Sequence, residues 1–315
     1  MKILFLCPDY LNIHKIIEEG ISVFLKAEVK TIVFQSYQYR NINEKIKNTL
    51  SKLIFKKNLK KIWASKMYYN QIDQNEEFDF VFVISPDYLT NYHLGLIKKK
   101  SKKMIVYFWD SFDWMNGKYE RTLPFFDKKF SFEPKDCEKY NLELLTNFYY
   151  DTTKAENIKN NAYYIGNFDN RINVIEKINN LLLKHNIVSN IYIKKNSNFI
   201  EKNYANNIIF IDDYIPLSES FQNLKKSKFA LDIHKSVQNG LTFRVFESIG
   251  LKKKLITTNK DIVNYDFYNP NNILIWNENL KEIPTDFLNN DYEQLSIEIY
   301  KKYSLENWVK TIFKI

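Results

Sequence analysis

Continuous apolar stretches alternate with amphipathic stretches along the first half of the chain. Residues 78–85 (FDFVFVIS) form an unbroken apolar run, which is typical of a strand buried on both faces. Residues 12–25 instead place apolar side chains at helical spacing. Strands are expected over residues 3–7, 28–35, 78–85, 103–109, 129–133 and 144–148, and helices over 12–25, 43–70 and 89–100. This alternation predicts a parallel sheet with helices on both faces.

The same alternation restarts after residues 151–161, a polar stretch without a strand pattern. Strands are expected over residues 162–165, 190–194, 208–211, 229–233, 255–258 and 273–276, and helices over 170–184 and 217–226. We therefore predict an α/β fold with two Rossmann-like domains, residues 1–155 and 156–291. A last helical segment, residues 292–315, is expected to pack back on the first domain.

Size and composition agree with a globular chain of two domains. The 315 residues are 45% hydrophobic, and no run of about 18 apolar residues suggests a membrane span. The first apolar run reaches Asp9 too early for a secretory signal peptide. Cys7 and Cys137 are the only cysteines. We expect two free thiols in a reducing cytoplasm, with a disulfide as the less favoured alternative.

The net charge of +9 comes mainly from lysines, which occur in runs such as 56–61, 98–103 and 252–254. A solvated surface explains most of them, and attraction to anionic lipids or anionic substrates is the functional alternative. Nucleic acid is disfavoured, because there is no zinc spacing, no RNA-binding aromatic signature and no arginine-rich arm. The aromatic residues, 16% of the chain, fall mostly within strand and helix patterns, so core packing explains them better than base stacking.

Several common catalytic signatures are missing. The sequence has no G-x-G-x-x-G, no phosphate loop and no G-x-S-x-G elbow. These absences disfavour a dinucleotide oxidoreductase, a P-loop NTPase and an α/β-hydrolase. Asp212-Asp213 and Asp110-x-x-Asp113 are poor substitutes for a metal-binding D-x-D motif at a strand end. We expect no obligatory metal and no cofactor.

The most informative stretch is residues 230–259, which reads as a strand, a polar loop, an amphipathic helix and a second strand. Gly240 and Arg244 lie at the start of that helix, in a chain with only 6 glycines and 4 arginines. Backbone N–H groups at a helix start, a flexible glycine and a guanidinium together suit a phosphorylated ligand.

Each residue at this helix start has an expected role. The backbone N–H groups of Leu241 and Thr242 can bind a diphosphate, and Arg244 can neutralise it. Glu247, one turn later, is placed to accept hydrogen bonds from ribose hydroxyls. The alternatives are a structural salt bridge for Arg244 and a solvated helix carboxylate for Glu247.

Four segments carry a resemblance to a known class of enzymes. They are QNGLTFRVFE at 238–247, FWDS at 108–111, FSFEPKD at 130–136, and residues 251–259 with the Y-x-F-Y-x-P run at 265–270. With the two-unit layout, these segments resemble GT-B glycosyltransferases of bacterial capsule, exopolysaccharide and lipopolysaccharide assembly. The resemblance implies that the donor nucleotide binds the second domain, the acceptor binds the first, and chemistry occurs in a central cleft.

The predicted donor site collects residues at the carboxyl ends of second-domain strands, where open α/β sheets bind ligands. Its members are Gly166, Arg171, His234, Gln238, Asn239, Gly240, Leu241, Thr242, Arg244 and Glu247. Arg171 resembles a second diphosphate contact, and a plain surface arginine is the alternative. His234 suits a donor-sugar or phosphate contact, and a structural histidine is the alternative.

The predicted catalytic site lies in the first domain. Asp110, directly after a strand, is the leading candidate for a catalytic or acceptor-binding carboxylate, with a helix N-cap as the alternative. His14 and Glu18, one turn apart in the first helix, are the next candidates, and a surface pair is their alternative.

The resemblance implies transfer of a sugar from a nucleotide diphosphate donor, most simply a UDP-sugar, to a growing bacterial surface polysaccharide or lipooligosaccharide. The expected partners are the nucleotide-sugar donor, an oligosaccharide or lipid-linked acceptor, and an anionic inner membrane that the enzyme contacts peripherally from the cytoplasm. A nucleotide-sugar epimerase of GT-B-like fold, and a non-catalytic module that binds anionic glycan or membrane, are the alternatives. The donor sugar, the acceptor and the stereochemical outcome stay open.

Overall fold

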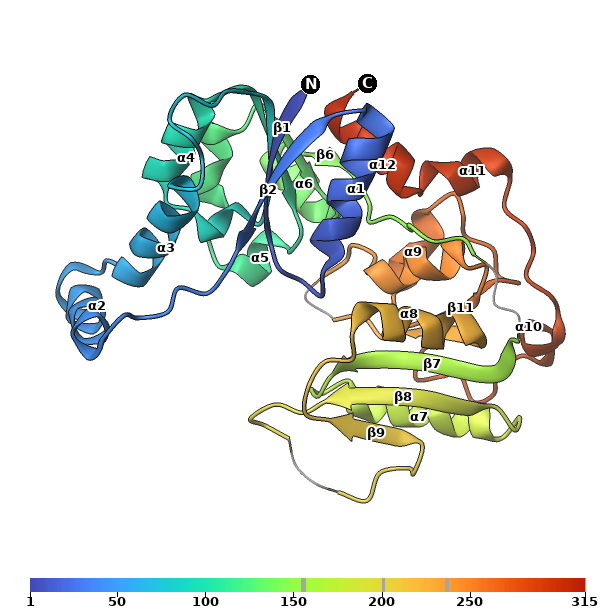
Figure 1. Cartoon of the computed structure of the whole chain (residues 1–315). Helices are drawn as coiled ribbons and strands as arrows, with labels where there is room; N and C mark the ends of the chain where they lie inside the picture. The colour runs from blue at the N-terminus through green and yellow to red at the C-terminus, as the bar shows by residue number, and fades with distance from the viewer. Residues whose placement is uncertain (154–156, 200–201, 236–237, 315) are drawn as a thin grey trace. The chain divides into compact units, whose positions relative to one another are not determined.

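The computed structural model describes residues 1–153, 157–199, 202–235 and 238–314 (Figure 1). The chain forms two compact units. The first contains Met1–Leu145 and the chain from Val309 onward, and the second contains Thr146–Trp308. The domain limits predicted from the sequence, 1–155 and 156–291, stay predictions about which pieces fold independently.

The first unit is built on a parallel sheet in the order β2-β1-β3-β4-β5-β6. Its strands are β1 (Lys2–Pro8), β2 (Glu28–Phe34), β3 (Phe78–Ile84), β4 (Ser101–Phe108), β5 (Lys128–Ser131) and β6 (Glu143–Leu144). In β1, residues 3–7 are all buried, as their continuous apolar sequence predicts. The register places Phe5 opposite Thr31 of β2 and Phe82 of β3.

Helices of the first unit cover this sheet. They are α1 (Ile13–Leu25), α2 (Ile42–Phe55), α3 (Leu59–Tyr69), α4 (Asn91–Lys98), α5 (Phe112–Met115) and α6 (Pro134–Tyr140), with 3-10 turns η1 (Pro86–Tyr88) and η2 (Glu120–Phe125). The single helix expected over 43–70 is wrong, because the chain breaks there into α2 and α3. Lys56 ends α2 with a left-handed backbone (φ 52°), and Asn58 caps α3 by accepting from the Lys61 N–H at 3.2 Å.

The end of α12 (Leu305–Phe313) packs on the sheet of the first unit. The rings of Phe5 and Phe82 stack at 5.3 Å between centroids. Phe313 meets Phe82 at 5.8 Å and Phe80 at 5.3 Å, both edge-on. Aromatic side chains of this size therefore anchor the C-terminal helix to β3 by apolar burial.

The second unit is built on a parallel sheet in the order β12-β11-β10-β7-β8-β9. Its strands are β7 (Lys159–Asn167), β8 (Val188–Lys194), β9 (Ile208–Ile211), β10 (Ser227–Asp232), β11 (Lys254–Thr257) and β12 (Ile273–Ile275). Its helices are α7 (Ile172–Leu183), α8 (Leu217–Lys226), α9 (Phe243–Gly250), α10 (Thr285–Asn289) and α11 (Ile297–Lys302), with the turn η3 (Lys260–Asn264). Alternate strand residues enter two separate apolar clusters, with Tyr164 and Leu231 in one and Tyr163 and Ala230 in the other. Both faces of this sheet are therefore buried.

Each sheet has one place where the strand order reverses. In the first unit it lies between β1 and β3, and in the second between β7 and β10. Open α/β sheets generally bind ligands beyond the carboxyl ends of the strands at this place, which is called the switch point. Among the described helices, none is long and apolar enough to cross a membrane.

Candidate functional site

Arg171 connects the carboxyl ends of β7 and β10, the two strands at the switch point of the second unit. It follows β7, and its guanidinium holds Asp169 through Nε–Oδ1 at 2.8 Å and Nη2–Oδ2 at 2.7 Å. Nη1 donates to the carbonyl of Ile233, just past β10, at 2.6 Å. The alternative of a plain surface arginine is thus wrong, because the side chain is a tether across the switch point. Its role as a diphosphate contact stays a prediction.

Asp232 at the end of β10 organises the start of α9. One carboxylate oxygen accepts from the Thr242 hydroxyl and the other from the Thr257 hydroxyl, both at 2.7 Å. Thr242 is the N-cap residue of α9, yet its side chain makes no capping hydrogen bond. Its hydroxyl points to Asp232 instead, which fixes the entrance to the helix while leaving the first-turn amides uncapped by that side chain. Sequence reasoning missed Asp232, for which a carboxylate within an apolar strand was the available signal.

His234 lies beside this network and faces the end of β11. Its backbone N–H donates to the Thr258 hydroxyl at 3.0 Å, and its Nδ1 lies 2.8 Å from the same oxygen. Burial lowers the pKa of His234, while the charges of Asp232 and Asp261 act in the opposite direction. The structure therefore places His234 at the predicted edge, with one ring nitrogen committed to Thr258.

The loop before α9 is fixed by amide side chains. Asn259 donates from Nδ2 to the carbonyl of Asn239 at 3.0 Å, and Asn239 donates to Asp261 at 3.0 Å. Leu241 is buried in the core and Gly240 is buried, whereas Gln238 is half-buried. The loop backbone is thus tied to the end of β11, which is the pre-organisation that a phosphate-binding loop needs.

Arg244 and Glu247 form an ion pair on the first turns of α9, which is the structural salt bridge named as the alternative for Arg244. Arg244 Nη1 lies 3.0 Å from Glu247 Oε2, but within the described part of the chain this nitrogen makes no hydrogen bond of good geometry. The guanidinium also lies over the Tyr163 ring, at 5.2 Å from its centroid. Glu247 is only 4% exposed, and burial raises its pKa while Arg244 opposes that effect. A solvated Glu247 is therefore wrong, and its ribose contact stays a prediction.

At Gly166, near the end of β7, the nearby Tyr164 side chain leaves no room for a Cβ atom. A Cβ at this position would lie 2.5 Å from the Tyr164 hydroxyl oxygen and 2.9 Å from two ring carbons. The Tyr164 ring is buried, so it cannot move aside cheaply. This close approach explains a glycine in the strand, whether or not a donor approaches it as predicted.

Gly166→Ala is expected to destabilise the protein by about 1–3 kcal/mol, because overpacking a filled core forces side chains off their rotamers. Urea unfolding measures this change. Gly95→Ala in α4 is the matched control, since its Cβ would meet its nearest neighbour at an ordinary 3.6 Å. That substitution should be neutral or stabilising, because alanine favours a helix by about 1 kcal/mol over glycine. Equal losses in the two variants would contradict the close approach.

The switch point of the first unit lies between the carboxyl ends of β1 and β3. The loop after β1 contains Leu11 and Asn12 in left-handed backbone conformations, with φ of 49° and 65°. His14 follows in the first turn of α1, buried, with Nδ1 at 3.4 Å from Asp9 Oδ1. A surface pair is therefore wrong for His14. Glu18, one turn later, is half-buried. A non-glycine left-handed backbone such as that of Leu11 is costly and is often found at functional sites.

Asp110 lies just past the end of β4, the strand next to β3. The N-cap of the following helix α5 is Ser111, whose hydroxyl accepts from the Trp114 N–H at 3.2 Å. The alternative role of Asp110 as that cap is therefore wrong. Its catalytic role stays a prediction, and the structure places it at the expected sheet edge.

Asp87 is a candidate that sequence reasoning did not assign. It lies in η1 after β3, and its Oδ1 is buried with no hydrogen-bond partner among the residues that the structure describes. Burial raises the pKa of Asp87, and the charges of Lys61 and Lys118 act against that effect. The charge of Asp110 raises it further, so the two carboxylates lie within electrostatic range. A half-buried carboxyl group with a perturbed pKa at the switch point of the sheet is a candidate for proton transfer.

The FSFEPKD segment contacts the residue that follows the FWDS segment and so stabilises the turn after β4. Asp136, in the first turn of α6, accepts from the backbone N–H of Phe112 at 2.9 Å. Burial raises the pKa of Asp136 to about 6, although that hydrogen bond lowers it. The rings of Phe112 and Tyr140 stack at 4.2 Å. The two segments thus bind one another, and together they hold the turn that carries Asp110.

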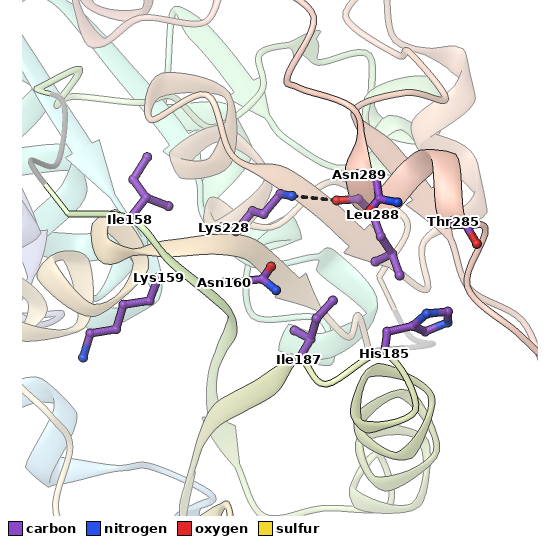
Figure 2. Close-up of a pocket in the computed structure, with 9 residues that line it drawn as sticks. All are labelled: Ile158, Lys159, Asn160, His185, Ile187, Lys228, Thr285, Leu288 and Asn289. Carbon is purple, nitrogen blue, oxygen red and sulfur yellow. Dashed lines mark hydrogen bonds between the residues drawn. The ribbon is translucent and has the colours of Figure 1, made fainter.

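A cavity of about 330 Å³ in the second unit lies away from this chemistry (Figure 2). Its lining includes Lys159 and Lys228, which begin β7 and β10, and His185 after α7. Lys228 Nζ donates to the carbonyl of Leu288 at 2.6 Å, as drawn in Figure 2. These are the amino-terminal ends of the strands, opposite to the edge that carries Arg171. The cavity is therefore not the predicted donor site.

In the part of the chain that the structure describes, no three histidine, cysteine, aspartate or glutamate side chains are grouped closely enough to hold a metal ion. Cys7 and Cys137 are free, as expected. Burial raises the pKa of both thiols, that of Cys137 to about 12. Neither cysteine is therefore a reactive thiolate at neutral pH.

Comparison with known proteins gives a fold and no sequence family. No family model matches the sequence, and no curated protein does. The structure is similar to a DNA-modifying β-glucosyltransferase studied with and without its substrate uridine diphosphoglucose. The TM-score is 0.52 at 15% identity, over 100% of both chains. An α1,3-fucosyltransferase matches with a TM-score of 0.47 at 12% identity, over 99% of this chain and 89% of that one. The glycosyltransferase SnogD from Streptomyces nogalater matches with a TM-score of 0.43 at 10% identity, over 100% of this chain and 94% of that one.

The likeness to β-glucosyltransferase spans both chains completely and shows the fold. The prediction of two Rossmann-like α/β units with parallel sheets is confirmed. The β-glucosyltransferase thus shares the α/β fold of this chain.

Proposed function

We propose that this protein is a glycosyltransferase that moves a sugar from a UDP-sugar to an acceptor hydroxyl. The observation that carries the proposal is the polar network at the β7–β10 switch point, which fixes the loop and the first turn of α9 around Arg244. The fold supports it, since β-glucosyltransferase uses uridine diphosphoglucose and has the same two-unit architecture.

In this proposal the second unit stabilises the leaving group. The acceptor oxygen forms a bond to the anomeric carbon, and the bond from that carbon to the β-phosphate oxygen breaks, so that UDP leaves with the electron pair. Negative charge grows on the diphosphate as it leaves. Arg244 and the first-turn amides of α9 supply fixed positive charge for it. Arg171 and Asp232 position the strand ends that carry these groups.

The first unit receives the acceptor in this proposal. Asp110 accepts the proton of the attacking hydroxyl, and a correctly placed base contributes about 10²–10⁴-fold to the rate. His14 and Glu18 in α1, which follows β1, and Asp87 in η1, which follows β3, are the next candidates for that proton. Burial raises the pKa of Asp87, and carboxyl groups with perturbed pKa values are often found at proton-transfer sites.

Several finer features belong to the proposal. The acceptor is a bacterial surface polysaccharide or lipooligosaccharide, as the four sequence segments suggest by resemblance. The enzyme works in the cytoplasm and contacts the anionic inner membrane peripherally, which the net charge of +9 favours. Transfer needs no obligatory metal, so EDTA should leave the rate unchanged. The absence of a D-x-D motif at a strand end supports this expectation.

Incubation with a panel of UDP-sugars, followed by mass spectrometry, tests the proposal. Slow release of UDP without an acceptor, accelerated by a suitable oligosaccharide, supports glycosyl transfer. Conversion of the sugar while it stays attached to UDP would instead identify an epimerase. If none of the UDP-sugars is bound or altered, both enzymatic assignments fail.

A further inference from the structure

Helix α2 of the first unit buries its polar face and exposes its apolar face, which is the reverse of an ordinary surface helix. Its buried positions are the polar residues Glu44, Asn48 and Ser51, which are 2–8% exposed and share one helical face. Glu44 accepts from the Tyr37 hydroxyl at 3.0 Å, and Asn48 donates to the Tyr39 hydroxyl at 2.8 Å. Hydrogen bonds, rather than apolar packing, therefore hold α2 to the rest of its unit.

The opposite face of α2 exposes large apolar side chains. Its apolar residues are Ile42, Ile46, Leu50, Leu53, Ile54 and Phe55, which are 50–74% exposed. The first five recur at i, i+4, i+8, i+11 and i+12, which places them along one stripe of the helix at about 100° per residue. Figure 1 shows α2 at the outer margin of the first unit, joined to β2 by an extended segment. A stripe of this kind marks an interaction surface, because isolated exposed apolar residues are ordinary but contiguous ones are not.

Positive charge surrounds this stripe. Five lysines lie between residues 42 and 57, and all are exposed, namely Lys45, Lys47, Lys52, Lys56 and Lys57. The only acidic residue in that range is Glu44, which is buried and ion-paired with Arg40 at 2.6 Å. The exposed side of α2 is therefore apolar in the middle and cationic along its flanks.

We propose that α2 is an interfacial membrane helix, whose apolar stripe enters the head-group boundary of an anionic bilayer while its lysines bind the lipid phosphates. Apolar residues on one face and lysines beside them are what such helices require. A second copy of the chain is the less favourable occupant, because two α2 surfaces would bring their lysines together. The proposal deepens the membrane contact suggested above and assigns it to one element, and it does not depend on the donor reaction.

The lysine run at 98–103 is a weaker candidate for the same contact. Lys98 and Lys102 donate to the carboxylates of Asp127 and Asp79, each at 2.7 Å. Lys100 donates to two backbone carbonyls, at 2.6 and 2.9 Å. These ammonium groups already have partners, and the run carries no exposed apolar stripe. Lys99 and Lys103, which are exposed in this run, therefore provide a control for charge alone.

Flotation of the full-length protein with lipid vesicles tests the inference. At low salt, vesicles of phosphatidylcholine with phosphatidylglycerol should retain the protein, and pure phosphatidylcholine vesicles should retain much less. The variant Ile46→Gln/Leu50→Gln/Leu53→Gln should bind at least about tenfold more weakly, because it removes apolar insertion but no charge. Lys45→Gln/Lys52→Gln should lose about fivefold per lysine on the anionic vesicles, and this loss should shrink as salt rises. Lys99→Gln/Lys103→Gln removes the same charge elsewhere and should bind like the unaltered protein.

Several results would overturn the inference. One is equal retention by neutral and anionic vesicles, and another is no retention at low salt. Equal loss in the α2 and Lys99/Lys103 charge variants would leave only a diffuse charge effect. If sedimentation velocity shows a dimer that the apolar variant abolishes, α2 is instead a contact between copies. UDP affinity, measured on the same variants without lipid, should be unchanged in each. A protein that floats but fails to bind UDP would refute the proposed function and leave the membrane helix standing.

Discussion

Replacing Arg244 with alanine is expected to weaken UDP binding by roughly 10–150-fold and to abolish most sugar transfer. A lost hydrogen bond to a charged group costs about 1.5–3 kcal/mol, which corresponds to that range of affinity. The effect should be large because the guanidinium sits in the first turn of α9, over the Tyr163 ring, and its Nη1 makes no well-aligned hydrogen bond within the described part of the chain. Calorimetric titration with UDP measures the change.

Alanine at this position also leaves Glu247 buried without its partner, so stability must be measured in parallel. Arg244→Lys keeps a positive charge beside Glu247 but removes the planar fork that binds phosphate oxygens in pairs. It should keep most of the stability and still lose affinity. Arg121→Lys, at an exposed arginine of the first unit, is the matched control and should change neither. Unchanged UDP affinity in a folded Arg244→Lys protein would remove Arg244 from the donor site.

Asp110→Asn is expected to lower kcat by about 10²–10⁴-fold while leaving UDP affinity intact, because a base acts on the transition state and not on the bound nucleotide. The fold should tolerate it, since Ser111 caps α5 and Asp136 holds the Phe112 N–H. Steady-state rates with saturating donor and acceptor, together with calorimetry, separate the two effects.

Two further variants decide between the neighbouring carboxyl and imidazole groups. Asp87→Asn changes η1 after β3, and His14→Gln changes the first turn of α1 after β1, and both variants keep the Asp110 side chain. If Asp110 is the base, each should cost less than Asp110→Asn. Full activity in Asp110→Asn, with a large loss in Asp87→Asn or His14→Gln, would transfer the role to that residue.

The strands and their burial could be predicted from local sequence. A continuous apolar run such as 78–85 indicates a strand that is covered on both faces, as in a parallel sheet. The break between α2 and α3 could not, because it depends on the left-handed backbone of Lys56 rather than on apolar spacing. The exposure of the apolar stripe of α2 could not be predicted from the sequence either. Periodicity reports that a face is apolar, and only the structure shows that Glu44 and Asn48 turn it away from the core.

In the candidate site, too, local features could be predicted from the sequence and contacts between distant residues could not. The glycine-preceded helix start with Arg244 was visible because the signal lies within a few residues. The tether from Arg171 to the Ile233 carbonyl joins positions 62 residues apart, and the hydrogen bond between Thr257 and Asp232 spans 25. Such partners come together only when parallel strands align, so a single sequence gives no local trace of them. The raised pKa of Asp87 depends likewise on the residues that pack around η1.

Hydrogen–deuterium exchange with and without UDP tests the central claim most directly, because it locates the nucleotide on the second unit. Backbone amides at 238–247 and 257–261, at the carboxyl ends of β10 and β11, should exchange more slowly when UDP is bound. Amides at 158–160 and 185–187, which line the cavity of Figure 2 at the opposite edge, should be unaffected. Protection confined to 158–160 and 185–187, or no protection at UDP concentrations that saturate the protein, would contradict a donor site at the start of α9.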